Sequence, residues 1–292
     1  MSESEVRPEW LKKRQPLSEA VMATRRAVKN LGLHTVCQSA RCPNISECFC
    51  SGNATFLILG DHCTRNCAFC AVEHGKPSSP DPEEGKKIVR YIEGAGTRYA
   101  VITSVTRDDL EDGGAAHFER VVRDIKNSLP EVGIELLVPD FHGRADLITR
   151  IAALPIQVFG HNLETVSSLY PRIRAGAGYE RSLELLRTAA AVLPPDRLLK
   201  SGIMLGLGES RGDLEVLFDD LAACGVRILT MGQYLRPTRE NTTVSRYYHP
   251  DEFAELKSLA EAREITTVVA APYVRSSYLA EEHYLATLRK SV

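Results

Sequence analysis

The sequence lacks the features of a nucleic-acid-binding, membrane-spanning or secreted protein. Its 292 residues carry 36 basic and 38 acidic side chains, so there is no excess of positive charge for nucleic acid. No apolar run approaches the ~20 residues that cross a bilayer. The first five residues, Met1 to Glu5, contain neither an apolar signal core nor an arginine-rich transit pattern. We therefore expect a cytoplasmic protein with no nucleic-acid or membrane partner.

Cysteine is nearly absent from most of the chain. Apart from Cys224, every cysteine falls between Cys37 and Cys70. A secreted protein held by disulfides would distribute its cysteines over the whole fold, whereas a cluster of this kind indicates metal ligation in a reducing compartment. No Ser-His-Asp arrangement or nucleophile elbow is visible either.

The densest group is Cys63, Cys67 and Cys70, which directly follows the apolar run 55–60. Three thiolates can hold three irons of a 4Fe-4S cluster, and the fourth iron is then open to a small molecule. The alternatives are a zinc knuckle or a set of buried thiols. Zinc sites usually close with four ligands in two pairs, and no matching pair follows Cys70.

A second triplet, Cys37, Cys42 and Cys48, lies just upstream and indicates a second cluster. Cys50 belongs to neither triplet, and we interpret it as a spare thiol. Residues 35–53 are rich in Cys, Ser, Asn and Gly without a clear period, so we expect ligands rather than secondary structure to fix this loop.

From residue 55 onward, apolar runs alternate with amphipathic stretches, which predicts a parallel sheet with helices outside. The clearest helices are expected over 17–31, 115–129 and 212–224. Periodicity does not distinguish a doubly wound sheet from an open or closed barrel, but in each case the site lies at the carboxyl ends of the strands. The expected strands are 55–60, 99–105, 134–138, 156–160, 199–205, 227–232 and 266–271.

The C-x3-C-x2-C spacing of Cys63, Cys67 and Cys70 resembles that of the radical S-adenosylmethionine (radical SAM) family. With the upstream triplet and the segment Arg275-Ser276-Ser277-Tyr278, the chain resembles the lipoyl synthase family along nearly its whole length. The resemblance implies an α/β fold, a partial (β/α)6 TIM-type barrel over residues 55–272. It also implies an arm and auxiliary-cluster loop over 1–54, and a C-terminal helical segment over 273–292.

The resemblance also implies a reaction. Electrons cleave two SAM molecules, and the resulting radicals remove hydrogen from C6 and C8 of an octanoyl chain on a lysine of a carrier protein. An auxiliary 4Fe-4S cluster, held by Cys37, Cys42, Cys48 and Ser276, donates the sulfur. A serine oxygen is a hard ligand on a soft site and should leave readily; the alternative is that Ser276 or Ser277 caps the last helix.

The implied partners are octanoylated lipoyl carrier proteins, namely 2-oxoacid dehydrogenase E2 subunits and the glycine cleavage H protein. Reduced flavodoxin or ferredoxin would supply electrons, and an iron-sulfur carrier would rebuild the spent cluster. Rival interpretations are a radical SAM enzyme of other chemistry, such as sulfur insertion into dethiobiotin or methylthiolation, and a non-catalytic iron-sulfur scaffold or electron carrier.

Polar segments that follow the second, third and fourth apolar runs supply candidate SAM contacts. Asn162 and Glu164 match the place where the family holds ribose, or they begin a helix. Phe69 lies beside the adenine in the family, or it is a core residue. Gly113 and Gly114 could let backbone carbonyls approach the SAM ammonium.

Overall fold

The computed structural model describes residues 7–13 and 18–290 and is built on one parallel sheet. The strand order follows the sequence, and each strand pairs in parallel with the next, for example Ile102 opposite Leu136. All seven expected strands are confirmed. They are β1 (Thr55–Ile58), β4 (Tyr99–Ser104), β5 (Gly133–Leu137), β6 (Val158–Gly160), β7 (Leu198–Leu205), β8 (Ile228–Gln233) and β9 (Thr267–Ala270).

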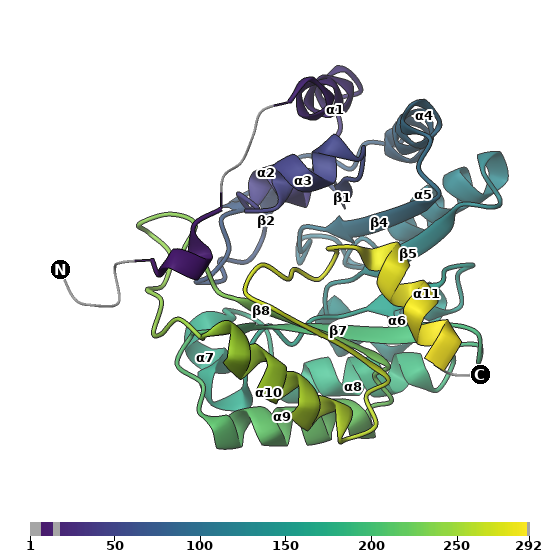
Figure 1. Cartoon of the computed structure of the whole chain (residues 1–292). Helices are drawn as coiled ribbons and strands as arrows, with labels where there is room; N and C mark the ends of the chain where they lie inside the picture. Colours follow the sequence, from purple (N-terminus) through teal and green to yellow (C-terminus); the bar gives the residue numbers. More distant parts are fainter. Residues whose placement is uncertain (1–6, 14–17, 291–292) are drawn as a thin grey trace.

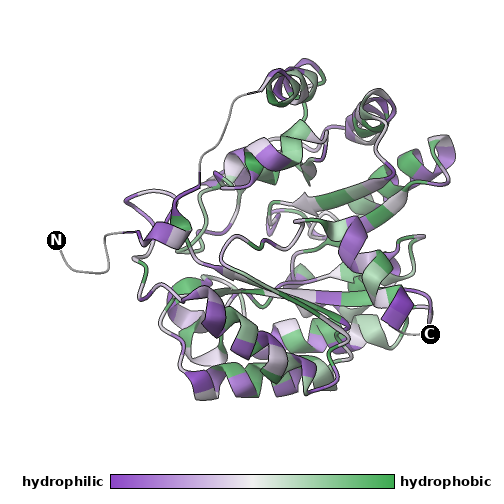
Figure 2. Ribbon diagram, viewed as in Figure 1, coloured by the Kyte–Doolittle hydropathy of each residue, from purple (hydrophilic) through white to green (hydrophobic). Residues whose placement is uncertain are grey.

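The helices between the strands bury one apolar face each against the sheet. In α5 (Ala115–Ser128), the residues Phe118, Val121, Val122 and Ile125 are buried as one stripe, as the helical period requires. Figure 2 shows hydrophobic residues along the strands and mixed polar and apolar residues on the helices. The other helices of the barrel are α4 (Glu84–Ala95), α6 (Ala145–Ala152), α7 (Tyr170–Ile173), α8 (Tyr179–Ala190), α9 (Arg211–Ala223) and α10 (Pro250–Glu261).

The expected helices over 115–129 and 212–224 are confirmed by α5 and α9. Ser210 caps helix α9. Its hydroxyl accepts from the Asp213 N–H, and the Asp213 carboxylate accepts from the Ser210 N–H. The expected N-terminal helix is α1 (Glu19–Asn30), capped by Ser18. Leu17 and the acidic N-terminal residues lie outside the described part of the chain.

The expectation that residues 35–53 lack secondary structure is wrong. They form two short helices, α2 (Val36–Ser39) and α3 (Ile45–Cys50). The reason is a small core of their own, in which Cys37, Ile45 and Phe49 pack against Val21 of α1. Apolar packing therefore contributes to the fold of this segment, in addition to any metal ligation.

Two strands, β1 and β9, form the edges of the sheet, so the barrel is open on one side. The C-terminal segment reaches the β1 edge, where the Thr55 hydroxyl donates to Ser277 Oγ at 2.7 Å. After it, α11 (Ala280–Lys290) contacts β8 and β9 (Figure 1). Its Tyr284 and Leu288 pack where three strands begin, against Val158, Leu198 and Ile228.

The N-terminal and C-terminal parts are in direct contact. Asn44 Nδ2 donates to the Tyr273 carbonyl at 2.6 Å, and the Tyr278 hydroxyl donates to Glu47 Oε1 at 2.5 Å. The division at residues 54 and 272 stays a prediction, and these two hydrogen bonds join α3 and the residue before it to the segment 273–278. Among the described residues, no helix has the length and hydropathy needed to cross a lipid bilayer.

Candidate metal centres

The loop that carries Cys63, Cys67 and Cys70 follows β1 at the carboxyl ends of the strands. It begins at a sharp turn, where Leu59 and Gly60 have φ angles of +70° and +95°. A short parallel pair, β2 (His62–Cys63) with β3 (Glu73–His74), closes the loop at its base. The site thus lies where parallel barrels place their chemistry.

Two backbone N–H groups point at the first thiol of this loop. The amides of Thr106 and Arg65 donate to Cys63 Sγ at 3.3 and 3.4 Å. The last cysteine is held through its backbone, since Asn241 Nδ2 donates to the Cys70 carbonyl at 2.8 Å. These hydrogen bonds position the cysteines and leave their sulfur atoms able to coordinate a metal.

The three thiols are free, half-buried and near one another. Burial raises the pKa of Cys67 to about 11 and that of Cys70 to about 12, and in each case a neighbouring thiol of the loop adds to the rise. Iron would displace these protons, because a coordinating thiol is deprotonated outright. The loop therefore supplies a donor set of closely spaced sulfurs.

Nowhere in residues 7–13 or 18–290 do three His, Cys, Asp or Glu side chains converge in an arrangement that would suit one metal ion. An iron-sulfur cube does not require such convergence, since each thiolate binds a different iron and the ligands surround a volume. The sulfur-only loop fits a cube better than a single zinc ion.

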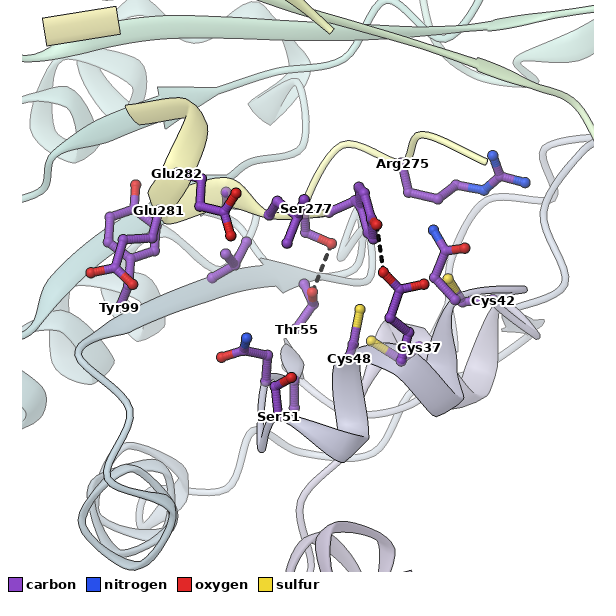
Figure 3. A pocket seen from close by; sticks show the side chains of 18 residues that line it. Cys37, Cys42, Cys48, Ser51, Thr55, Tyr99, Arg275, Ser277, Glu281 and Glu282 are labelled. Carbon is purple, nitrogen blue, oxygen red and sulfur yellow. Dashed lines mark hydrogen bonds between the residues drawn. The ribbon is translucent and has the colours of Figure 1, made fainter. Parts of the chain in front are cut away.

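The upstream triplet lines a separate cavity of about 170 Å³. Figure 3 shows Cys37, Cys42 and Cys48 on one side of it, with Arg275 and Ser277 of the C-terminal segment on the other. Burial raises the pKa of Cys37 to about 11 and that of Cys48 to about 12, and neighbouring thiols of the triplet contribute. The structure thus unites the triplet with the segment 275–278, about 230 residues further along the chain.

The two serines of that segment point to different places. Ser277 lines the cavity and shares a hydrogen bond with Thr55, whereas Ser276 is not among the lining residues. The Ser276 hydroxyl instead donates to Asn162 Oδ1 at 3.1 Å. Because α11 begins at Ala280, neither serine directly precedes that helix. The ligand role of Ser276 stays a prediction.

Asn162 and Glu164 follow β6 on the side of the cysteine loop. Asn162 Nδ2 donates to Glu164 Oε1 at 3.0 Å, and the charge of Glu164 raises the pKa values of Cys67 and Cys70. Burial raises the pKa of Glu164 itself. The helix-start alternative for Asn162 is wrong, since the next helical turn, η4, begins at Ser167.

The other expected SAM contacts have clear packing partners. Phe69 is partly buried against a small cluster of Ile173, Leu207, Tyr234 and Val244. A Cβ on Gly114 would lie 2.3 Å from Leu59 Cδ1, and one on Gly113 would lie 3.1 Å from Phe141 Cδ1. Close packing at the start of α5 therefore accounts for both glycines, and their contact with SAM stays a prediction.

Two arginines lie beside these centres; Arg174 was not found from the sequence, and Arg275 was named there only as part of the segment 275–278. Arg174 Nη1 donates to the Asn162 carbonyl at 2.9 Å and interacts electrostatically with Cys67 and Glu164. Arg275 interacts with Cys42 of the upstream triplet and also with Glu164, although burial lowers its pKa. Only proximity in the fold reveals Arg174 and the electrostatic role of Arg275, because arginine in a loop has no pattern that marks such a role.

Comparison with known proteins agrees with this arrangement. The model of the radical SAM superfamily matches residues 57–221, more than half of the chain. The fold is also that of a maturase of the FeFe-hydrogenase, HydG from Carboxydothermus hydrogenoformans. That structure has a TM-score of 0.58 at 14% identity, with 92% of this chain and 74% of the other covered. Fold and cysteine loop together define a radical SAM protein.

Curated relatives identify the family within the radical SAM superfamily. The lipoyl synthase of Nitratidesulfovibrio vulgaris strain DP4 is 48% identical over 286 residues, which cover 97% of this chain and 95% of the relative. The lipoyl synthase of Caldicellulosiruptor saccharolyticus is 46% identical, with 94% and 96% covered. The chain belongs to the lipoyl synthase family.

Proposed function

We propose that this protein is a sulfurtransferase that inserts sulfur at C6 and C8 of an octanoyl chain amide-linked to a lysine of a lipoyl carrier protein. The observation that carries the proposal is that one segment, residues 275–278, reaches both the upstream triplet and the Asn162 and Glu164 side of the cysteine loop. Arg275 interacts with Cys42 and with Glu164. Ser276 bonds to Asn162, and Tyr278 bonds to Glu47 beside Cys48.

The ligand assignment follows from the two donor sets. Cys63, Cys67 and Cys70 would hold a 4Fe-4S cluster with one open iron. Cys37, Cys42 and Cys48 would hold the auxiliary 4Fe-4S cluster, and the family resemblance, rather than the cavity lining, supports Ser276 as its fourth ligand. When bound, the first cluster supplies the electron that cleaves SAM to a 5′-deoxyadenosyl radical, and the second supplies sulfur.

The protein's own side chains bind and orient SAM. Asn162 and Glu164 present an amide and a carboxylate to the ribose hydroxyls, and Phe69 offers an aromatic face to the adenine. Arg174 places a positive charge beside Cys67, which suits the carboxylate of SAM. Burial of Glu164 and of the thiols keeps water away from the radical.

The proposed reaction determines which partner proteins the enzyme needs. Each radical takes one hydrogen atom and becomes 5′-deoxyadenosine, so two SAM molecules and two electrons are used for each lipoyl group. A reduced flavodoxin or ferredoxin would deliver the electrons. Because sulfur leaves the auxiliary cluster, an iron-sulfur carrier is needed to rebuild it. The carrier substrates would be E2 subunits of 2-oxoacid dehydrogenases and the glycine cleavage H protein.

The test is anaerobic analysis of reconstituted protein given SAM, reductant and an octanoyl-lysine peptide. We expect about eight irons per chain, 5′-deoxyadenosine and a dithiolated peptide. Cys63→Ala should abolish 5′-deoxyadenosine formation, because the cluster loses one of its three protein ligands. About four irons with 5′-deoxyadenosine but an unchanged peptide would refute sulfur insertion. Absence of 5′-deoxyadenosine from the wild type would favour the scaffold alternative.

A further inference from the structure

Arg65, between Cys63 and Cys67, connects the cysteine loop to two strand ends of the barrel. Its Nε and Nη2 donate to the Asp108 carboxylate at 2.7 and 2.8 Å. Its Nη1 and Nη2 donate to the Asp140 carboxylate at 2.9 and 2.8 Å. One guanidinium thus makes two bidentate pairs, the strongest kind of hydrogen bond between side chains.

The pair with Asp140 is shielded from water, and the pair with Asp108 is partly open to it. The side chain of Arg65 is 7% exposed, that of Asp140 is 0% exposed and that of Asp108 is 28% exposed. Burial alone would raise the pKa of Asp140, but the Arg65 and Arg181 guanidiniums hold it well below its usual range. Asp140 is therefore ionised, and its pair with Arg65 is a buried ion pair, whose loss of one partner is costly.

The segment that carries Asp108 also touches the thiol directly. Thr106 donates its N–H to Cys63 Sγ, and its carbonyl accepts from the Thr64 N–H at 3.0 Å. The Asp108 N–H in turn donates to Thr64 Oγ1 at 3.0 Å. A hydrogen bond to a cluster sulfur tunes the reduction potential, so the position of this segment matters to the cluster.

We propose that Arg65 is a positioning residue for the SAM-binding 4Fe-4S cluster. By bridging Asp108 after β4 and Asp140 after β5, it fixes the separation of Cys63 and Cys67 and keeps the Thr106 N–H on Cys63 Sγ. This inference rests on the proposed function only in that the loop holds the cluster. It gives a role to two acidic loop residues that the proposed reaction does not use.

A lysine cannot replace this arginine in such a role. Two bidentate pairs need the planar fork of five donors, whereas an ammonium is a point charge with three. If Arg65 supplied only positive charge near the cluster, Arg65→Lys would retain it. The comparison of Arg65→Lys with Arg65→Gln therefore separates geometry from charge.

The experiment uses the full chain, reconstituted anaerobically, as wild type, Arg65→Lys, Arg65→Gln and the matched control Arg150→Gln. Arg150 makes a bidentate pair with Glu119 at 2.9 and 3.0 Å, and its side chain is 46% exposed. The readouts are the rate of iron loss to a chelator, the midpoint potential, and the change in the EPR spectrum of reduced protein on adding SAM. None of them needs the octanoyl peptide.

We expect both Arg65 variants to lose iron about tenfold faster or more, since each removes charged hydrogen bonds. Their potential should shift and their EPR response to SAM should change, while Arg150→Gln behaves as wild type. If an Arg65 variant does not fold, Asp108→Asn should show the same changes at smaller size, because it weakens one bidentate pair.

Wild-type iron retention, potential and EPR response in both Arg65 variants would overturn the proposal, even if their melting temperature falls. Recovery of all three readouts by Arg65→Lys would also overturn it, since charge would then suffice. A wild-type protein that shows the EPR response but leaves the peptide unchanged would instead contradict the proposed function and leave this inference standing.

Discussion

Replacing Ser276 and Ser277 one at a time tests which oxygen belongs to the auxiliary cluster. Ser276→Ala removes one neutral hydrogen bond, the one to Asn162 at 3.1 Å. Ser277→Ala removes the acceptor of the Thr55 hydroxyl at 2.7 Å. Each loss is worth ~1 kcal/mol, or about fivefold in an equilibrium constant. The two variants are therefore matched in structural cost.

If Ser276 is the fourth ligand of the auxiliary cluster, its loss should have a far larger effect, and on lipoyl formation alone. We expect Ser276→Ala to lower lipoyl formation by about a hundredfold or more, beyond the ~1 kcal/mol that the lost bond explains. Formation of 5′-deoxyadenosine should stay within about fivefold, since the SAM-binding cysteines are untouched. Ser277→Ala should leave both products within that range.

Both products are measured by mass spectrometry in the same quenched anaerobic reaction, so one sample gives the ratio. Equal loss of both products in Ser276→Ala, or loss of neither, would refute the ligand role of Ser276. A selective loss of lipoyl in Ser277→Ala instead would transfer the role to Ser277, the serine that lines the cavity.

Further predictions concern stability and SAM affinity. Lys200 Nζ lies 2.7 Å from Glu135 Oε1 with both side chains buried, so Lys200→Met should cost ~3–5 kcal/mol by stranding a carboxylate. Addition of Glu135→Leu should restore most of this in urea unfolding, and no recovery would contradict the pairing. Burial lowers the pKa of His161 from 6.5 to about 4, so this neutral ring contributes stability above pH 6.5 that is lost as the pH falls toward 4. The full loss is ~3 kcal/mol, of which ~2 kcal/mol falls between pH 7 and 5. His161→Gln should flatten that slope in urea titrations at pH 7 and 5, and an equal slope would exclude His161 as its source. Gly114→Ala would put a Cβ 2.3 Å from Leu59 Cδ1 at a φ of +90°, so thermal unfolding should show a loss of ~1–3 kcal/mol. SAM affinity of the folded variant should be unchanged, and a large loss would instead support a ligand role for this glycine.

The barrel could be predicted from the sequence because its information is local. Each strand is a short apolar run and each helix an amphipathic stripe, so both signals are complete within about fifteen residues. The prediction for residues 35–53 was wrong for the opposite reason, because the signal there is not local. Ile45 and Phe49 do lie one helical turn apart, but their partner, Val21, belongs to another helix. Cysteines and polar residues between them hid the pattern.

The site was predictable where spacing alone defines it, as in Cys63, Cys67 and Cys70. It was not predictable where partners come from distant parts of the chain. Arg65, Asp108 and Asp140 look in the sequence like ordinary charged loop residues. Only the fold buries Arg65 and Asp140 and pairs Arg65 with both carboxylates, because three separate loops meet at the carboxyl ends of β1, β4 and β5.

The contacts of the C-terminal segment decide what the catalytic unit is. A barrel with a cysteine loop could bind and cleave SAM, but the open side between β1 and β9 would leave its radical exposed. Residues 273–278 lie at the β1 edge and bond to Asn44, Glu47 and Thr55. Through Arg275 and Ser276 the same segment reaches the Asn162 and Glu164 side. The segments before and after the barrel therefore contact each other at its β1 edge, and one of them also reaches the side of the cysteine loop.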